Sequence, residues 1–295
     1  MQHSNIIFSR PEPGVMSMYE KISICIIFMS DTIITTGKYS VAGTADWLTL
    51  PAGAFMSVPF IIAASFIMRR CRNSLFINIC AALFSAAAVM LTLYVFSDFV
   101  KTCVIPEINM MLIPAGILIT AFYSAFRTTD TLCRAVHMIM PIIIIFSVCA
   151  LIIASTRFRT DNITGSAFLP PAAASASSSV FAAVFTVKAM LILCIFSSGK
   201  STRSDCAAVC AGTLIYAAVM SAMLFTSLGV LGAGLYRRLD YPLYYPLGLT
   251  GIGDYFERTE IISVVMFMVI LVFKTGIFIR TIIASCSRIR KQVHL

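Results

Sequence analysis

The chain has 295 residues, of which 59% are apolar and only 12% are charged, against about 45–50% and about 25% in soluble domains. It carries 22 Lys and Arg residues against 13 Asp and Glu residues, for a net charge of +9. So few charges cannot cover the core of a soluble protein of this size. The composition excludes a soluble enzyme, a disordered chain and a secreted disulfide scaffold, and indicates an integral membrane protein.

Long apolar runs define the expected architecture. A helix needs about 20 mostly apolar residues to cross the hydrocarbon core, and helices satisfy their own backbone groups there. We expect an all-α transmembrane bundle of about eight spans at 22–283, between a cytoplasmic segment at 1–21 and a basic tail at 284–295. The spans are residues 22–37, 47–68, 74–97, 108–126, 136–154, 179–198, 206–235 and 260–283.

The basic residues predict the orientation. If the N-terminus is cytoplasmic, thirteen Lys and Arg residues fall in inner segments and seven in outer segments. Cytoplasmic loops are the ones that carry such an excess. Both termini are therefore expected in the cytoplasm, and the positive charge needs no nucleic-acid partner.

Two outer loops are long. Residues 155–178 include a run of Ala and Ser that predicts a linker with little structure. Residues 236–259 are rich in Tyr, Pro and Gly, and this loop is expected to lie along the membrane surface or to re-enter it. Before it, Gly229, Gly232 and Gly234 permit close helix packing or a hinge.

Ionisable residues inside apolar runs are candidate site residues, because charge is costly in lipid. Asp31 lies in the middle of the run at 22–37 and is followed by Thr32 and Thr35, as in a broken helix that exposes backbone groups to a ligand. A loop that begins at Asp31 explains it equally well. Lys188 is deep within its span, and we hypothesise that it pairs with Asp31 in one cavity. The alternative is a side chain that reaches the interface.

Lys274 also lies well inside the last run, where it either reaches the inner face or pairs with a neighbouring helix. The sequence contains no nucleotide-binding loop, zinc-protease motif or nucleophile elbow, so an enzyme is not expected. The ten cysteines form no Cys-x-x-Cys pair, and neither a metal site nor a cofactor is predicted.

Four blocks carry a family resemblance. The stretch from Ser97 to Pro106, with Asp98 and Lys101, resembles the Ser-Glu-Phe-Ile-Lys-Thr…Pro motif of the GerAB-type spore germination permeases. Asp46-Trp47-Leu48 resembles the Asp-Ala-Trp-Leu of that family. The third block, Asp130, Arg134 and Pro141, resembles the Glu…Arg…Pro pattern of the family. The fourth resembles its Tyr-Pro…Gly-Glu-Phe-x-Glu-Arg-x-Glu…Lys block and consists here of Tyr241, Pro242, Gly253, Arg258, Glu260 and Lys274.

This resemblance implies a LeuT-like fold of the amino acid–polyamine–organocation superfamily. Family members have ten spans, with the first and sixth broken around the ligand, so this chain lacks the last two. It also departs from the pattern at both breaks, with Ser30-Asp31-Thr32 at the first and Lys188 in the sixth span. His137 and Phe267 replace an acidic residue and a Trp.

The resemblance implies a B-type subunit of a spore germinant receptor. Such a subunit binds a small nutrient, such as an amino acid, and signals to A and C subunits in the spore inner membrane or the cell membrane. Asp31, Thr32, Thr35 and Lys188 are the expected ligand-binding residues. Two alternatives are an amino-acid secondary transporter and a membrane scaffold that binds no small molecule.

Overall fold

The computed structural model describes residues 17–30, 43–71, 74–107, 109–126, 129–163, 171–196, 203–249 and 260–293. These residues form helices and no strand, as the sequence predicts. The elements are α1 (Met18–Met29), η1 (Gly43–Ala45), α3 (Asp46–Cys71), α4 (Leu75–Cys103), α5 (Leu112–Ala125), α6 (Thr129–Ser155), η2 (Thr160–Ile163), α7 (Pro171–Phe196), α8 (Arg203–Tyr236), α9 (Tyr245–Leu249) and α10 (Glu260–Val293).

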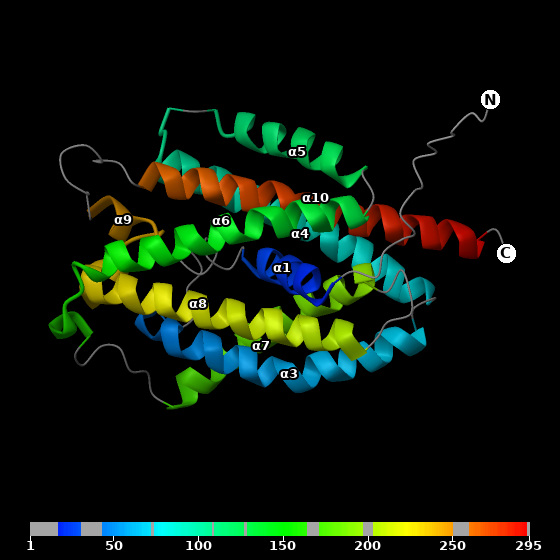
Figure 1. The fold of residues 1–295 in the computed structure, drawn as a ribbon, viewed down its shortest axis with the longest axis horizontal. Helices are drawn as coiled ribbons and strands as arrows, with labels where there is room; N and C mark the ends of the chain where they lie inside the picture. The colour runs from blue at the N-terminus through cyan, green and yellow to red at the C-terminus, as the bar shows by residue number, and fades with distance from the viewer. Residues whose placement is uncertain are drawn as a thin grey trace, which may run out of the picture.

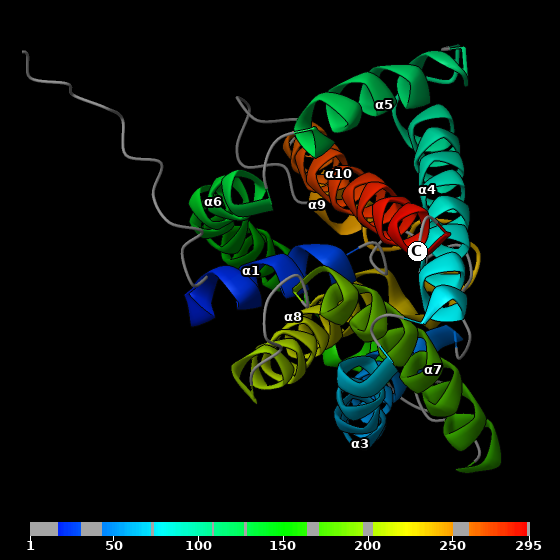
Figure 2. The ribbon, with the colours of Figure 1, turned by 90° about the vertical axis from the view of Figure 1, so that its right-hand side faces the viewer.

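The long helices run side by side in one bundle (Figure 1). In the end-on view of Figure 2, α4, α5 and α10 form one side of the bundle and α3, α7 and α8 the other. The most extensive packing joins α3 to α7 and α10 to α4. The short helix α1 packs against α8 and α6 and ends inside the bundle.

Six helices of the described residues are long and apolar enough to span a membrane: α3, α4, α6, α7, α8 and α10. The other two predicted spans correspond to shorter helices, α1 with 12 residues and α5 with 14. At 1.5 Å per residue these cover about 18 and 21 Å, less than the roughly 30 Å of hydrocarbon. The chain is a multi-pass membrane protein, and its described part contains six helices of sufficient length and hydropathy to span the membrane.

Glycines let three helix pairs approach closely. A Cβ on Gly53 of α3 would lie 2.5 Å from the Cβ of Phe181 on α7, and one on Gly212 of α8 would lie 2.5 Å from the Cβ of Cys25 on α1. Gly276 of α10 sits in the same way against α5. Association in lipid depends on such packing, because lipid tails are as apolar as the side chains.

The prediction of an unstructured linker before the sixth span is wrong. Residues 171–179 form the first turns of α7, beginning at Pro171. Proline is favoured in the first turn of a helix, where its missing N–H has no partner to lose. Ser175, Ser177 and Ser179 bond to backbone carbonyls three residues earlier, which satisfies their hydroxyls inside the helix.

The predicted cytoplasmic ends of several helices meet at one end of the bundle. At the start of α1, Lys21 contacts Asp205 at the start of α8. At the end of α10, Arg288 donates to the carbonyl of Cys194 in the last turn of α7. The first described helix therefore begins at the end of the bundle where the last described helix finishes.

Candidate functional site

A cavity of about 280 Å³ lies between α1, α6, α8, α9 and α10. Most of its lining is aliphatic or aromatic, and no charged side chain lines it within the described residues. Six of the lining residues carry a hydroxyl group: Ser30, Ser147, Tyr216, Thr226, Ser227 and Ser263. An apolar pocket with a few polar groups is the usual form of a small-molecule site, so this cavity is the candidate site.

The end of α1 forms part of the cavity wall, through Ile26 and Ser30. The helix finishes at Met29, and the Ser30 N–H donates to the carbonyl of Ile27 at 3.2 Å. The last four carbonyls of a helix have no partner within it, and together they carry a partial negative charge. This end of α1 therefore favours a positively charged or hydrogen-donating group of a ligand.

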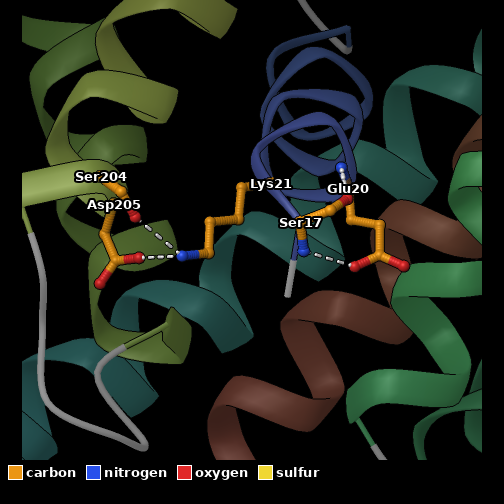
Figure 3. A network of polar contacts seen from close by, with 5 residues as sticks. All are labelled: Ser17, Glu20, Lys21, Ser204 and Asp205. Atoms are coloured by element: carbon orange, nitrogen blue, oxygen red, sulfur yellow. Dashed lines mark hydrogen bonds and ion pairs between the residues drawn. The ribbon is translucent and has the colours of Figure 1, made fainter. Parts of the chain in front are cut away.

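The opposite end of α1 is held in place by side chains (Figure 3). Ser17 and Glu20 form a capping box: the Ser17 hydroxyl accepts from the Glu20 N–H, and a Glu20 carboxylate oxygen accepts from the Ser17 N–H at 2.9 Å. This arrangement satisfies two N–H groups at the start of the helix.

A buried ion pair then joins α1 to α8. The Lys21 ammonium donates to Asp205 Oδ1 at 2.6 Å and to the Ser204 hydroxyl at 3.1 Å, as Figure 3 shows. Both charged residues are buried, at 7% and 4% exposed. Since α1 and α8 both line the cavity, this pair fixes the relative position of two of its walls.

The predicted ligand-binding residues are only partly within the described chain. Asp31, Thr32 and Thr35 lie outside the described residues, directly after the cavity-lining Ser30. Lys188 is buried on α7 at 9% exposed, and no described residue of α7 lines the cavity. The Asp31–Lys188 pairing therefore stays a prediction.

Lys274 is completely buried in α10, at 0% exposed. Its ammonium lies 5.6 Å from the ring centre of Phe278, and that ring packs on Phe28 in the last turn of α1 at 4.6 Å. The sequence placed Lys274 well inside the last span, and the structure puts it in the bundle core, next to the contact between α10 and α1.

Two of the motif blocks meet at the far end of the bundle. The Tyr241 hydroxyl donates to Asp98 Oδ2 on α4 at 2.6 Å. Burial raises the pKa of Tyr241, and the hydrogen bond to Asp98 and the charge of that carboxylate raise it further, so the phenol stays a protonated donor at neutral pH. The ring of Tyr241 also packs edge-on against Phe99 at 5.1 Å.

The described part of the loop after α8, residues 237–249, packs into the bundle. Tyr236, Tyr241 and Tyr244 are all buried. Whether the loop lies along the membrane surface or re-enters the membrane stays a prediction. The neighbouring Pro242 accepts a 2.6 Å hydrogen bond at its carbonyl from Ser227 on α8. Ser227 lines the cavity, so the Tyr-Pro motif is linked directly to the cavity wall.

The predicted glycine hinge coincides with a break in α8. Gly232 has φ 72° and ψ 156°, values that suit glycine and not other residues. Gly229 accepts hydrogen bonds at its carbonyl from the Asn162 side chain at 2.7 Å and from the Arg159 N–H at 3.2 Å. A methyl group on Gly229 would collide with the ring of Phe158. Gly234 has open space around it.

Two other motif residues, Lys101 and Arg134, do not line the cavity. Lys101 and Arg134 are exposed on α4 and α6. Asp130 and Glu260 stand in the first turns of α6 and α10, and Arg258 lies outside the described residues. No group of three or more His, Cys, Asp or Glu side chains in the described part of the chain could hold a metal ion.

The sequence profile of the spore germination protein family matches residues 73–294, from just before α4 to the end of α10. The chain belongs to this family. The match includes Asp98, Lys101, Arg134, Tyr241 and Lys274, and it starts after α1 and α3. No curated protein sequence matches the chain. As a member of the spore germination family, the protein is a permease-like membrane protein involved in germination.

Sequence reasoning missed the Lys21–Asp205 pair and the cavity lining. Both Lys21 and Asp205 precede an apolar run, where a charge is ordinary and draws no attention. The lining hydroxyls are single Ser, Thr and Tyr residues within otherwise apolar helices. Only the packing of α1, α6, α8 and α10 shows that they face one space.

Proposed function

We propose that the protein is the membrane-embedded B-type subunit of a spore germinant receptor, and that it binds a small nutrient in the cavity beside the end of α1. The family match supports a role in germination. The observation that carries the binding proposal is the helix α1, which ends inside the bundle with Ser30 in the cavity wall.

The nutrient class follows from the chemistry of this wall. The carbonyl end of α1 suits an ammonium group, the hydroxyls suit hydrogen bonding, and the aliphatic lining suits an apolar side chain. An amino acid with a small apolar side chain combines these features. Asp31 and Thr32 follow Ser30 directly and Thr35 comes three residues later, and in this proposal they complete the ligand contacts. Lys188 lies on α7, whose described residues do not line the cavity, and in this proposal it contributes by pairing with Asp31.

Signalling requires that the nutrient prefer one of two receptor states, since a ligand with equal affinity for both shifts nothing. In this proposal the change in α1 and α8 passes to A and C subunits in the spore inner membrane. Both termini face the cytoplasm in this arrangement, which agrees with the meeting of Lys21 with Asp205 and of Arg288 with α7 at one end of the bundle.

The test is ligand-dependent stabilisation of the purified chain, with amino acids and nucleosides as probes. A ligand at 100 times its Kd stabilises the folded state by about 2.7 kcal/mol. We expect this gain to disappear in Ser147→Phe, which fills the cavity, and to persist in Cys149→Phe, whose side chain is exposed on the same helix. Asp31→Asn and Lys188→Met test the predicted ligand contacts.

Two outcomes would overturn the proposal. One is a folded chain that no nutrient stabilises, which favours a scaffold. The other is stabilisation that Ser147→Phe leaves unchanged, which places the nutrient elsewhere. Nutrient uptake into vesicles would identify a transporter instead of a receptor subunit.

A further inference from the structure

The cavity has an opening on one side of the bundle. Four of its lining residues are exposed: Ile144 and Val148 on α6, at 51% and 49%, and Ile215 and Val219 on α8, at 45% and 39%. Each pair is four residues apart, so its two side chains stack on the same face of a helix. The two pairs form the opposite rims of a gap between α6 and α8.

The gap is closed at both ends of the bundle. Toward the end where Lys21 meets Asp205, α1 packs against both α6 and α8 and lies between them (Figure 2). Toward the other end, Phe158, just after α6, closes the gap between α6 and α8. Its ring packs against Phe225 on α8, with ring centres 5.4 Å apart, and lies close to Gly229. The opening therefore faces sideways, not toward either end of the helices.

The depth of the opening determines what surrounds it. Ile144 and Val219 lie near the middle of α6 and α8, two of the full-length spans. Of the six long helices, α6 is also the least covered by the rest of the described protein. In a bilayer the middle of a span faces acyl chains, because the headgroups lie at the helix ends.

The rim of the opening and the interior of the cavity are both mainly apolar. All four rim side chains are aliphatic, and the described interior offers aliphatic and aromatic surface with scattered hydroxyls and no charge. A charged molecule passing between these four rim side chains would lose its water without gaining a partner from them, which is very costly. A hydrocarbon chain moves from one apolar medium to another at no such cost.

We propose that this opening admits an acyl chain of a surrounding phospholipid into the cavity, with the headgroup remaining at the membrane surface. The chain passes between Ile144 and Val148 on one side and Ile215 and Val219 on the other. In the proposed receptor, chain and nutrient compete for the same space. That consequence rests on the proposed function, whereas admission of the chain does not.

The experiment uses the full chain in phosphatidylcholine vesicles that contain a phosphatidylcholine with a photoreactive diazirine in the middle of one acyl chain. After irradiation, the labelled residues are mapped by mass spectrometry. We expect label on Tyr216 and Met220, which line the cavity but are only 3% and 1% exposed. Lipid that stays outside the protein cannot reach these two side chains.

Val148→Trp and Val219→Trp narrow the opening from its two sides. Each should lower labelling of Tyr216 by roughly tenfold, which corresponds to about 1.4 kcal/mol against occupancy. The matched control is Ile145→Trp, because Ile145 is 64% exposed on α6 and does not line the cavity. It should leave labelling of Tyr216 unchanged.

The proposal is overturned if label appears only on exposed residues and never on Tyr216 or Met220. It is also overturned if the two rim variants label Tyr216 as strongly as the unaltered protein, or if Ile145→Trp lowers the labelling equally. Label on Tyr216 in a chain that no nutrient stabilises would support the opening and contradict the nutrient site, so the two failures are distinguishable.

Discussion

Replacing Lys21 with Met removes the cation that joins α1 to α8 while keeping most of the side-chain volume. The ammonium–carboxylate distance of 2.6 Å corresponds to an attraction of about 6 kcal/mol at an effective dielectric constant of 20. Desolvation of the two ions offsets several kcal/mol each. The intact pair therefore has a small net effect on stability. Removing only one partner has a large effect, because it leaves the other charge buried without its counterion.

Asp205 is only 4% exposed, so in Lys21→Met a buried carboxylate loses its cation. Breaking a buried pair in this way costs about 3–5 kcal/mol. We expect the free energy of unfolding, measured by chemical denaturation in detergent micelles, to fall by that amount. The double variant Lys21→Met/Asp205→Leu should recover most of the loss, because well-packed apolar side chains replace a buried pair at little or no cost.

The neighbouring Glu20→Gln is the matched control. It removes a charge from the same turn of α1 but leaves a side-chain oxygen that can still accept the hydrogen bond from the Ser17 N–H. It should lower the free energy of unfolding by less than about 1 kcal/mol. A cost below about 1 kcal/mol for Lys21→Met, typical of exposed pairs, would refute the reasoning. So would a double variant whose loss equals the sum of the two single losses, since that result means no coupling.

Gly53→Ala should lower the free energy of unfolding by about 1–3 kcal/mol, because the added methyl group would lie 2.5 Å from the Cβ of Phe181. The control is Gly116→Ala, where no atom lies within 4 Å of the added Cβ. In chemical denaturation its free energy of unfolding should be unchanged or up to about 1 kcal/mol higher. Equal effects would mean that α3 and α7 are not packed as described. Tyr241→Phe should lower the free energy of unfolding by about 1–3 kcal/mol, because it removes a hydrogen bond to the Asp98 carboxylate. A thermal unfolding midpoint equal to that of the unaltered protein would contradict that contact.

Two local features were partly within reach of the sequence. Asp31, Thr32 and Thr35 indicated that the first span at 22–37 is either broken or followed early by a loop, and α1 ends at Met29. The glycines before the Tyr-rich loop indicated close helix packing or a hinge, and the backbone of α8 departs from helix at Gly232. Both features are local, because they depend on the residue type at one position and its immediate neighbours.

Other features were misjudged or left open because local composition was ambiguous. The Ala and Ser run at 172–179 has the composition of a linker, but Ala is the best helix former and packing against α3 completes the helix. Tyr236, Tyr241 and Tyr244 are typical of a membrane boundary, and the sequence left open whether their loop lies along the surface or re-enters; the structure shows that partners on α4 bury Tyr241 and Tyr244 in the bundle.

The sequence by itself determined that this is a helical membrane protein of the spore germination family, because hydropathy and motif spacing are properties of contiguous residues. The tertiary structure alone decided that Lys21 pairs with Asp205, 184 positions away, that Asp98 pairs with Tyr241, and that α6 and α8 leave an opening between them. Most residues on every face of these helices are apolar, so hydropathy does not distinguish the face that meets lipid from the face that meets another helix. That distinction arises only when the helices pack.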